Sequence, residues 1–113
     1  MILDIGEKVH IIEKRKFLED VRRHFIGEVT RCTDSSLRVK GYAWVFDRME
    51  SMYTRYPDKR ERVISLEGDL IINIIPQDVI ISDVKYVKNA EKGLVVMDSK
   101  RTILAINEFG PGQ

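Results

Sequence analysis

Residues 25–46 read FIGEVTRCTDSSLRVKGYAWVF, and this stretch decides the fold class. Apolar and polar side chains alternate on both sides of a polar break, which is the period-two pattern of two β-strands. The break, Thr33-Asp34-Ser35-Ser36, consists of residues whose side chains bond to their own backbone in turns. The stretch therefore predicts an antiparallel hairpin, with a bend at Gly27 where the missing side chain permits close backbone approach.

The second strand of this hairpin has two distinct faces. One face is small or apolar, and the other interleaves cations with aromatic rings: Arg38, Lys40, Tyr42, Trp44 and Phe46. Tyr53, Arg55 and Tyr56 continue this composition into the next connection. Rings among cations are typical of single-stranded nucleic-acid binding and equally of protein interfaces. Because strand edges need partners, the pattern favours a subunit interface over RNA on this face.

Short runs rich in Ile and Val extend the sheet on both sides of the hairpin. They predict strands at 9–12, 63–66, 70–75, 79–81, 84–87, 94–97 and 102–106. Glu67-Gly68-Asp69 predicts a second hairpin, and the polar residues 98–101 predict a terminal one. Residues 47–62 predict a long exposed connection, while 14–24 fit either one helical turn or a hairpin loop.

These elements predict an all-β fold, a small and strongly bent antiparallel barrel of the Sm-like or SH3-like kind with an added C-terminal β-hairpin. A chain of 113 residues fits a single domain over 1–113. Within it we expect a barrel core at 6–75 and a C-terminal strand and hairpin extension at 76–113.

Composition narrows the class of protein further. Lys and Arg number 19 against 18 Asp and Glu, so the net charge neither demands nor repels a polyanion. The lone Cys32 excludes an intramolecular disulfide, which favours a reducing compartment. The first residues lack the pattern of a secretory signal, and the apolar runs are too short to cross a bilayer. The sequence therefore predicts a cytoplasmic protein without a membrane partner.

Candidate catalytic and metal-binding residues are few. His10 and His24 have no companion at ligand spacing, so they are expected to be structural or surface histidines. Cys32 has no local nucleophile signature and is expected to be a buried small residue. We find neither an acid and base pair nor a glycine-rich phosphate loop before a helix. The sequence predicts no enzyme, no metal and no cofactor.

One segment is rich in positive charge and could contact phosphates. Lys14, Arg15, Lys16, Arg22 and Arg23 lie close in the chain, opposed only by Glu19 and Asp20. Together with the second hairpin strand they form the candidate nucleic-acid-binding set, which adds Arg38, Lys40, Tyr42 and Trp44. The alternative is a solvated loop, which is the commoner role of such charge runs.

Two short motifs resemble those of the Sm and Sm-like family, which includes Hfq. Asp34-Ser35-Ser36-Leu37-Arg38-Val39 is similar to the first, with Arg38 in place of an asparagine. Leu66-Glu67-Gly68-Asp69-Leu70-Ile71 is similar to the second, with Glu67 in place of an arginine. The resemblance covers Gly6 to Ile75 and implies motif loops at Asp34, Gly68 and Asp69, which in the family's rings bind single-stranded RNA. A glutamate there would repel phosphate.

The functional expectation is a non-catalytic homo-oligomer, a ring formed by strand-edge pairing that binds or scaffolds. A single-stranded RNA-binding protein is the alternative, with affinity that falls steeply with salt. The order and spacing of the predicted strands also fit an interaction domain of the PRC-barrel type.

Overall fold

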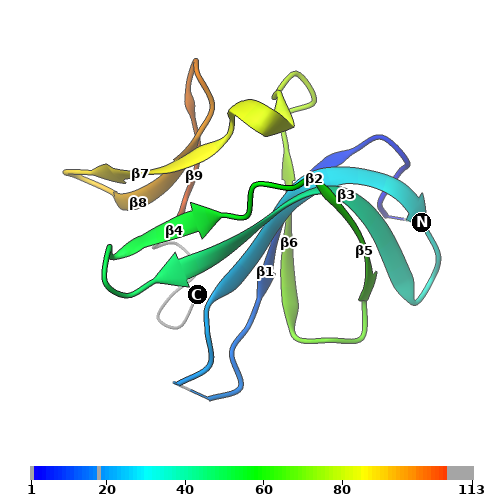
Figure 1. Ribbon diagram of the computed structural model, residues 1–113. Helices are drawn as coiled ribbons and strands as arrows, with labels where there is room; N and C mark the ends of the chain where they lie inside the picture. Colours follow the sequence, from blue (N-terminus) through cyan, green and yellow to red (C-terminus); the bar gives the residue numbers. More distant parts are fainter. Residues whose placement is uncertain (1, 18, 107–113) are drawn as a thin grey trace.

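The computed structural model describes residues 2–17 and 19–106. These residues form nine β-strands and one short 3-10 turn, with no α-helix among them. The strands lie in two antiparallel sheets (Figure 1). The all-β class predicted from the sequence is therefore confirmed.

The first sheet has six strands built around the predicted hairpin. They are β1 (Lys8–Glu13), β2 (Arg23–Cys32), β3 (Ser36–Asp47), β4 (Met52–Arg55), β5 (Arg60–Ser65) and β6 (Leu70–Ile75). The order is β4-β3-β2-β1-β6, and β5 also pairs with β3. Because β3 is 12 residues long, it has room for two partners besides β2: β5 along Ser36–Gly41 and β4 along Trp44–Asp47.

The second sheet has three strands in the order β7-β8-β9. They are β7 (Lys85–Asn89), β8 (Gly93–Met97) and β9 (Thr102–Ala105), and η1 (Ile81–Asp83) precedes them. The predicted terminal hairpin is confirmed as β8–β9, where the Asp98 Oδ1 atom accepts the amides of Lys100 and Arg101 at 2.9 and 2.8 Å. Residues 107–113 of the expected C-terminal extension lie outside the described residues.

Two glycines allow β2 and β3 to approach each other closely. Gly27 and Gly41 face each other in the register of these strands. A Cβ atom built on Gly41 would lie 2.1 Å from the Ile26 carbonyl oxygen, and one on Gly27 would lie 2.5 Å from the Lys40 carbonyl oxygen. Both contacts are with backbone, which cannot rotate away, so no larger residue fits at either position without moving a strand.

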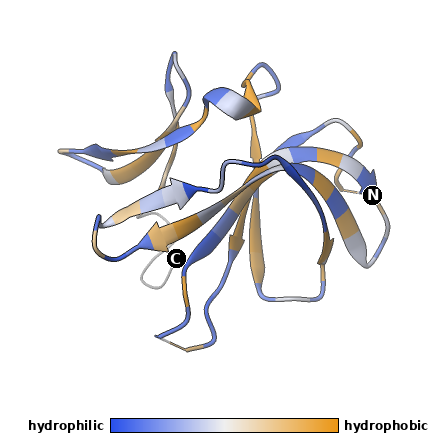
Figure 2. Cartoon of the chain, in the orientation of Figure 1, coloured by the Kyte–Doolittle hydropathy of each residue, from blue (hydrophilic) through white to orange (hydrophobic). Residues whose placement is uncertain are grey.

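The central strands bury both of their faces. One face packs within the first sheet in a cluster that we call the first-sheet core: Val9, Ile11, Phe25, Val29, Leu37, Val39, Ala43 and Ile64. The opposite face packs against the second sheet in the intersheet core: Ile26, Trp44, Tyr53, Ile75, Val79, Val84, Tyr86, Val96 and Ile106. Figure 2 shows apolar residues along the strands and hydrophilic residues concentrated in the connections.

Three sequence predictions of secondary structure are wrong. The expected connection 47–62 contains β4 and the start of β5, and its Tyr53 is only 3% exposed. In the predicted strand at 79–81, Val79 and Ile80 have no regular secondary structure and Ile81 begins η1. Strands β5 and β6 follow one another but do not pair as a hairpin, because β5 pairs with β3 and β6 with β1.

Neither sheet closes into a barrel within the described residues. The first sheet ends at Ile75 and the second begins at Lys85. The segment between them is fastened to β1, since the Lys8 ammonium donates to the carbonyls of Gln77 and Val79 at 2.8 and 2.5 Å. Arg101 of the β8–β9 turn forms an ion pair with Asp78 in the same segment. In the described part of the chain, no helix is long and apolar enough to cross a membrane.

Candidate functional site

The predicted basic segment lies at the open end of the β1–β2 hairpin. Lys14, Arg15 and Lys16 are in the β1–β2 loop, Arg22 ends this loop, and Arg23 is the first residue of β2. Arg15 and Arg22 are half-buried, while the other three are exposed. The structure therefore brings the five cations into one region, with two of them held against the protein.

The cations of the β3 face lie beside carboxylates. Lys40 lies in register between Glu28 on β2 and Glu61 on β5. The Arg38 guanidinium is 3.6 Å from the Glu61 carboxylate. Carboxylates on both sides lower the positive potential that a phosphate backbone needs, so this strand does not continue the basic segment.

The aromatic half of the same face is covered by the chain's own second sheet. Trp44 is 6% exposed and belongs to the intersheet core. Tyr42 is partly buried, and the Arg55 guanidinium lies 4.4 Å from its ring centroid. Since a base must reach the face of a ring to stack on it, Trp44 is not available to RNA while the two sheets are packed together.

The two motif-like loops lie next to each other. The Leu66 amide donates to the Ser35 carbonyl at 2.9 Å, which joins the end of β5 to the β2–β3 turn. Asp34 lies in this turn, and Gly68 and Asp69 lie in the β5–β6 turn. A pocket of about 540 Å³ adjoins both loops and is lined by Ile2, Leu3, Cys32, Asp34, Leu66, Ile72 and Ile74. Its lining is apolar apart from Asp34 and Cys32, and it includes no cation.

Cys32 is half-buried at the edge of this pocket, so the prediction of a buried cysteine is wrong. It is the last residue of β2, where the strand gives way to the turn. Its thiol donates to the Thr33 carbonyl at 3.5 Å.

The structure also shows a polar cluster that sequence reasoning missed. His10 on β1 and His24 on β2 are 0% and 2% exposed, and Tyr86 on β7 is 6% exposed. The His10 Nε2 atom lies 3.2 Å from His24 Nδ1 and 3.1 Å from the Tyr86 hydroxyl, which is 2.5 Å from His24 Nδ1. The histidines are 14 residues apart but lie diagonally on paired strands, so only the strand register could have predicted the contact.

Hydrogen-bond chemistry fixes an order of protons through this cluster. The Asn73 Nδ2 group can only donate, and it lies 3.2 Å from His10 Nδ1, so the proton of neutral His10 is on Nε2. The His10 Nε2 group then donates to the Tyr86 oxygen, and the Tyr86 hydroxyl donates to His24 Nδ1. This leaves the His24 proton on Nε2, a buried atom without a hydrogen-bond partner.

Burial keeps both histidines neutral. It lowers the pKa of His10 from 6.5 to about 4. It lowers the pKa of His24 to about 2, with smaller contributions from the charges of His10 and Arg22. Burial also raises the pKa of the Tyr86 hydroxyl well above its usual value. All three groups are therefore uncharged at neutral pH, as an ordered chain of neutral hydrogen bonds requires.

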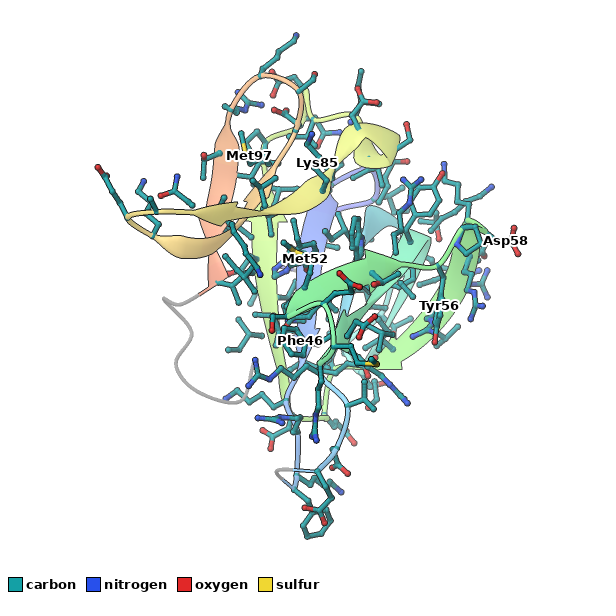
Figure 3. All side chains as sticks on the ribbon, turned by 60° about the vertical axis from the view of Figure 1, so that its left-hand side comes forward. Phe46, Met52, Tyr56, Asp58, Lys85 and Met97 are labelled. Carbon is teal, nitrogen blue, oxygen red and sulfur yellow. The ribbon has the colours of Figure 1, made fainter. Side chains whose placement is uncertain are left out.

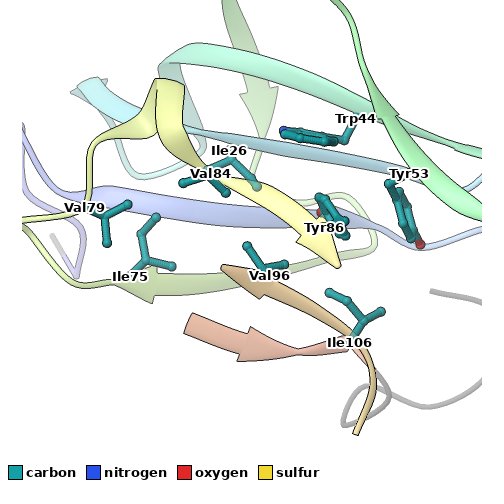
Figure 4. Packing of buried hydrophobic residues seen from close by; sticks show 9 residues of the cluster. All are labelled: Ile26, Trp44, Tyr53, Ile75, Val79, Val84, Tyr86, Val96 and Ile106. Atoms are coloured by element: carbon teal, nitrogen blue, oxygen red, sulfur yellow. The ribbon is translucent and has the colours of Figure 1, made fainter. Parts of the chain in front are cut away.

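Aromatic ring contacts extend the cluster through the intersheet core (Figure 4). The Tyr53 ring lies 4.4 Å from His24 and 4.5 Å from Tyr86, measured between centroids, and Trp44 lies 4.8 Å from Tyr86. Burial raises the pKa of Tyr53 to about 12, although a hydrogen bond from Arg22 acts in the opposite direction. The cluster thus fastens β7 of the second sheet to β1, β2 and β4 of the first.

The described residues contain no group of three or more His, Cys, Asp or Glu side chains placed to hold a metal ion. The His-Tyr cluster adjoins the intersheet core, and none of its three residues lines the pocket beside the motif-like loops. Its evident chemical role is to satisfy buried polar groups where the two sheets meet.

Among the described strands of the first sheet, β4, β5 and β6 each pair with one strand only, and β5 and β6 are the two that present an exposed apolar residue to the free edge. Among the described strands, β5 pairs only with β3 and β6 only with β1. Each carries an exposed apolar residue, Val63 on β5 at 67% exposure and Ile74 on β6 at 56%. Unpaired edges with exposed apolar side chains are sites at which chains associate.

Comparison with known proteins finds no family model, no curated protein and no solved structure that matches this chain.

Proposed function

We propose that this chain is a non-catalytic, Sm-like barrel protein that assembles with copies of itself by pairing strand edges, and that the assembly is a binding or scaffolding module. The observation that supports this most directly is the arrangement of β5 and β6. They are the outer members of the five-strand series β5-β3-β2-β1-β6, and residues 66–69 connect them. The sheet is thus bent until its two ends come within one short turn of each other, yet they do not pair.

Edge pairing between copies would complete the series. The β5 edge of one protomer and the β6 edge of the next are different surfaces, so their contact is of the head-to-tail kind. Such contacts repeat around a closed ring when the rotation between neighbours permits it. Val63 and Ile74 would be covered by this pairing, which accounts for their exposure in the single chain.

The pocket beside the motif-like loops fits the same proposal. It includes Ile72 and Ile74 of β6 and therefore extends the β6 edge with further apolar surface. An apolar lining without cations suits a protein segment better than a phosphate backbone. The chemistry at the motif-like loops thus favours protein contact over RNA.

Light scattering of the purified chain tests the proposal. We expect a solution mass at least twice the 13.2 kDa of one chain. Val63→Lys and Ile74→Lys should each lower this mass toward the monomer, because a charge on an edge strand opposes pairing. Ile80→Lys is the matched control: Ile80 is 58% exposed but lies outside the strands, so its variant should keep the mass of the parent protein.

A strictly monomeric parent protein at high concentration would overturn the proposal. An equal loss of mass in Ile80→Lys would also overturn it, because the effect would then come from added charge and not from the edges. Circular dichroism of each variant should match that of the parent, which separates loss of assembly from loss of fold.

A further inference from the structure

A second pocket lies at the opposite end of β1 from residues 2–6, between the β1–β2 loop and the β3–β4 turn. Its volume is about 440 Å³. Arg15 and Arg22 come from the loop, Arg48 from the turn, and Phe46 from the end of β3. Figure 3 shows Phe46 on the side of the sheet from which the β1–β2 loop projects. We call this site the arginine pocket.

Arg22 is held in place by the buried core. Its guanidinium carbon lies 4.8 Å from the centroid of the Phe46 ring. Its side chain also donates a hydrogen bond to that of Tyr53, which is 3% exposed and whose ring centroid lies 4.4 Å from that of His24. An arginine fixed in this way loses little conformational entropy on contacting a ligand, which is the benefit of a preorganised site.

Positive charge is in excess in the arginine pocket. Glu19 and Asp20 also line it, against three arginines. The Asp20 carboxylate is used locally, since it accepts the Phe17 amide at 3.2 Å. Over the described ranges, neither Arg22 nor Arg48 forms an ion pair with a carboxylate. Arginine side chains without a carboxylate partner are suited to bind phosphate.

The combination of groups indicates a specific class of ligand. A planar ring can stack on an aromatic or guanidinium face, and the pocket is lined by Phe46 with the Arg22 guanidinium packed over its ring. The exposed Arg48 at the mouth of the pocket supplies donors to an anion. The volume lies within the range of pockets that hold small ligands.

We propose that the arginine pocket binds a nucleotide, with its phosphate between Arg15 and Arg48 and its base against Phe46 and Arg22. The nucleotide is either free or one unit of a single-stranded RNA. This site is separate from the strand edges β5 and β6, so it is independent of the proposed self-assembly. It also differs from the two motif-like loops, which lie at the other pocket.

Isothermal titration calorimetry of the full chain with AMP, adenosine, pyrophosphate and a hexameric RNA tests the proposal. We expect AMP to bind more tightly than adenosine or pyrophosphate, because it alone engages both the arginines and the ring. Arg48→Gln should weaken AMP binding about tenfold or more, the typical effect of losing a hydrogen bond to a charged group. Affinity should fall as salt is added.

Arg23→Gln is the matched control. It removes the same charge from an exposed neighbour on β2 that does not line the pocket, so AMP affinity should be retained. If the hexamer competes with AMP and is weakened equally by Arg48→Gln, the ligand is a unit of RNA. If the hexamer does not compete, the ligand is a free nucleotide.

The proposal fails if neither AMP nor the hexamer binds at millimolar concentration. It also fails if Arg23→Gln weakens binding as much as Arg48→Gln, because this would show general attraction to the basic loop. Both variants change exposed residues, so their unfolding midpoints should match that of the parent protein.

Discussion

Single residues set the geometry of this protein, and the glycines of β2 and β3 do so most directly. Gly27 and Gly41 lie opposite each other where the strands come closest. The sequence predicted a bend at Gly27, because glycine interrupts a regular alternation there. The matching role of Gly41 depends on which residue it faces, and this is known only once the strand register is known.

Gly41→Ala is expected to destabilise the fold by roughly 2–4 kcal/mol, because a methyl group there would overlap the Ile26 carbonyl and the Gly27 Cα atom. Gly68→Ala is the control, since the nearest atom to its added Cβ would be 3.5 Å away. Urea denaturation of both variants measures the difference. Equal losses of stability would show that the close approach at Gly41 is not a constraint on the fold.

The buried histidines make the fold sensitive to acid. Burial lowers the pKa of both His10 and His24 below 6.5, so the unfolded chain binds more protons than the folded chain in mildly acidic solution. The contribution of neutral histidine to stability is fully present above pH 6.5 and is lost as the pH falls toward 4 for His10 and toward 2 for His24. At pH 5 the loss is about 2 kcal/mol for each histidine that stays neutral in the fold.

Urea denaturation at pH 7.5 and pH 5 checks this prediction. His10→Leu, which removes one titrating group from the buried polar cluster, should show about half the pH dependence of the parent protein. A free energy of unfolding that is equal at the two pH values would contradict the assignment of buried neutral histidines. The Asp78 and Asp98 carboxylates do not account for a difference between these pH values, since their pKa values are lowered from an already acidic 3.8.

At the scale of elements, alternation along the chain predicted most strands but not their partners. It identified β2 and β3 because these strands are long and their period is regular. It missed β4, whose four residues Met52–Arg55 are too few to show a period and lie among charged residues. The glycine turn between β5 and β6 led to the prediction that these two strands pair with each other. Pairing with β3 and with β1 determines their positions instead.

Tyr86 joins the second sheet to the first through both its ring and its hydroxyl, and the two contributions can be separated. Tyr86→Phe removes the hydroxyl but lets His10 Nε2 donate directly to His24 Nδ1, which is 3.2 Å away. We therefore expect it to lower the free energy of unfolding by only about 1 kcal/mol. Tyr86→Ala also removes the stacked ring and should cost about 3–5 kcal/mol.

Fluorescence of Trp44, the single tryptophan, reports on this junction during denaturation because its ring lies 4.8 Å from Tyr86. The phenylalanine variant should keep the emission of the native parent protein. If Tyr86→Phe lowered the free energy of unfolding as much as Tyr86→Ala, the hydroxyl, and not the ring, would hold the two sheets together.

At the scale of the whole molecule, the chain covers one side of its own hairpin. The sequence showed that β3 has an aromatic face and predicted a second subunit to cover it. The face is covered instead by β7–β9, which come from the same chain. Local periodicity reveals that a face is apolar, but the identity of the covering element depends on packing between residues far apart in sequence. For the same reason, the arginine pocket could not be predicted from the sequence, because Arg48 belongs to a turn that is distant in sequence from the basic segment.

The two-sided burial of the central strands has a consequence for biosynthesis. The first sheet is fully translated at Ile75, but the residues that cover Trp44 and Tyr53 extend to Ile106. At about 5–20 residues per second, a ribosome needs on the order of a few seconds to supply them. During this interval the nascent chain carries a folded or folding sheet with an uncovered aromatic surface, which is the surface a chaperone would protect.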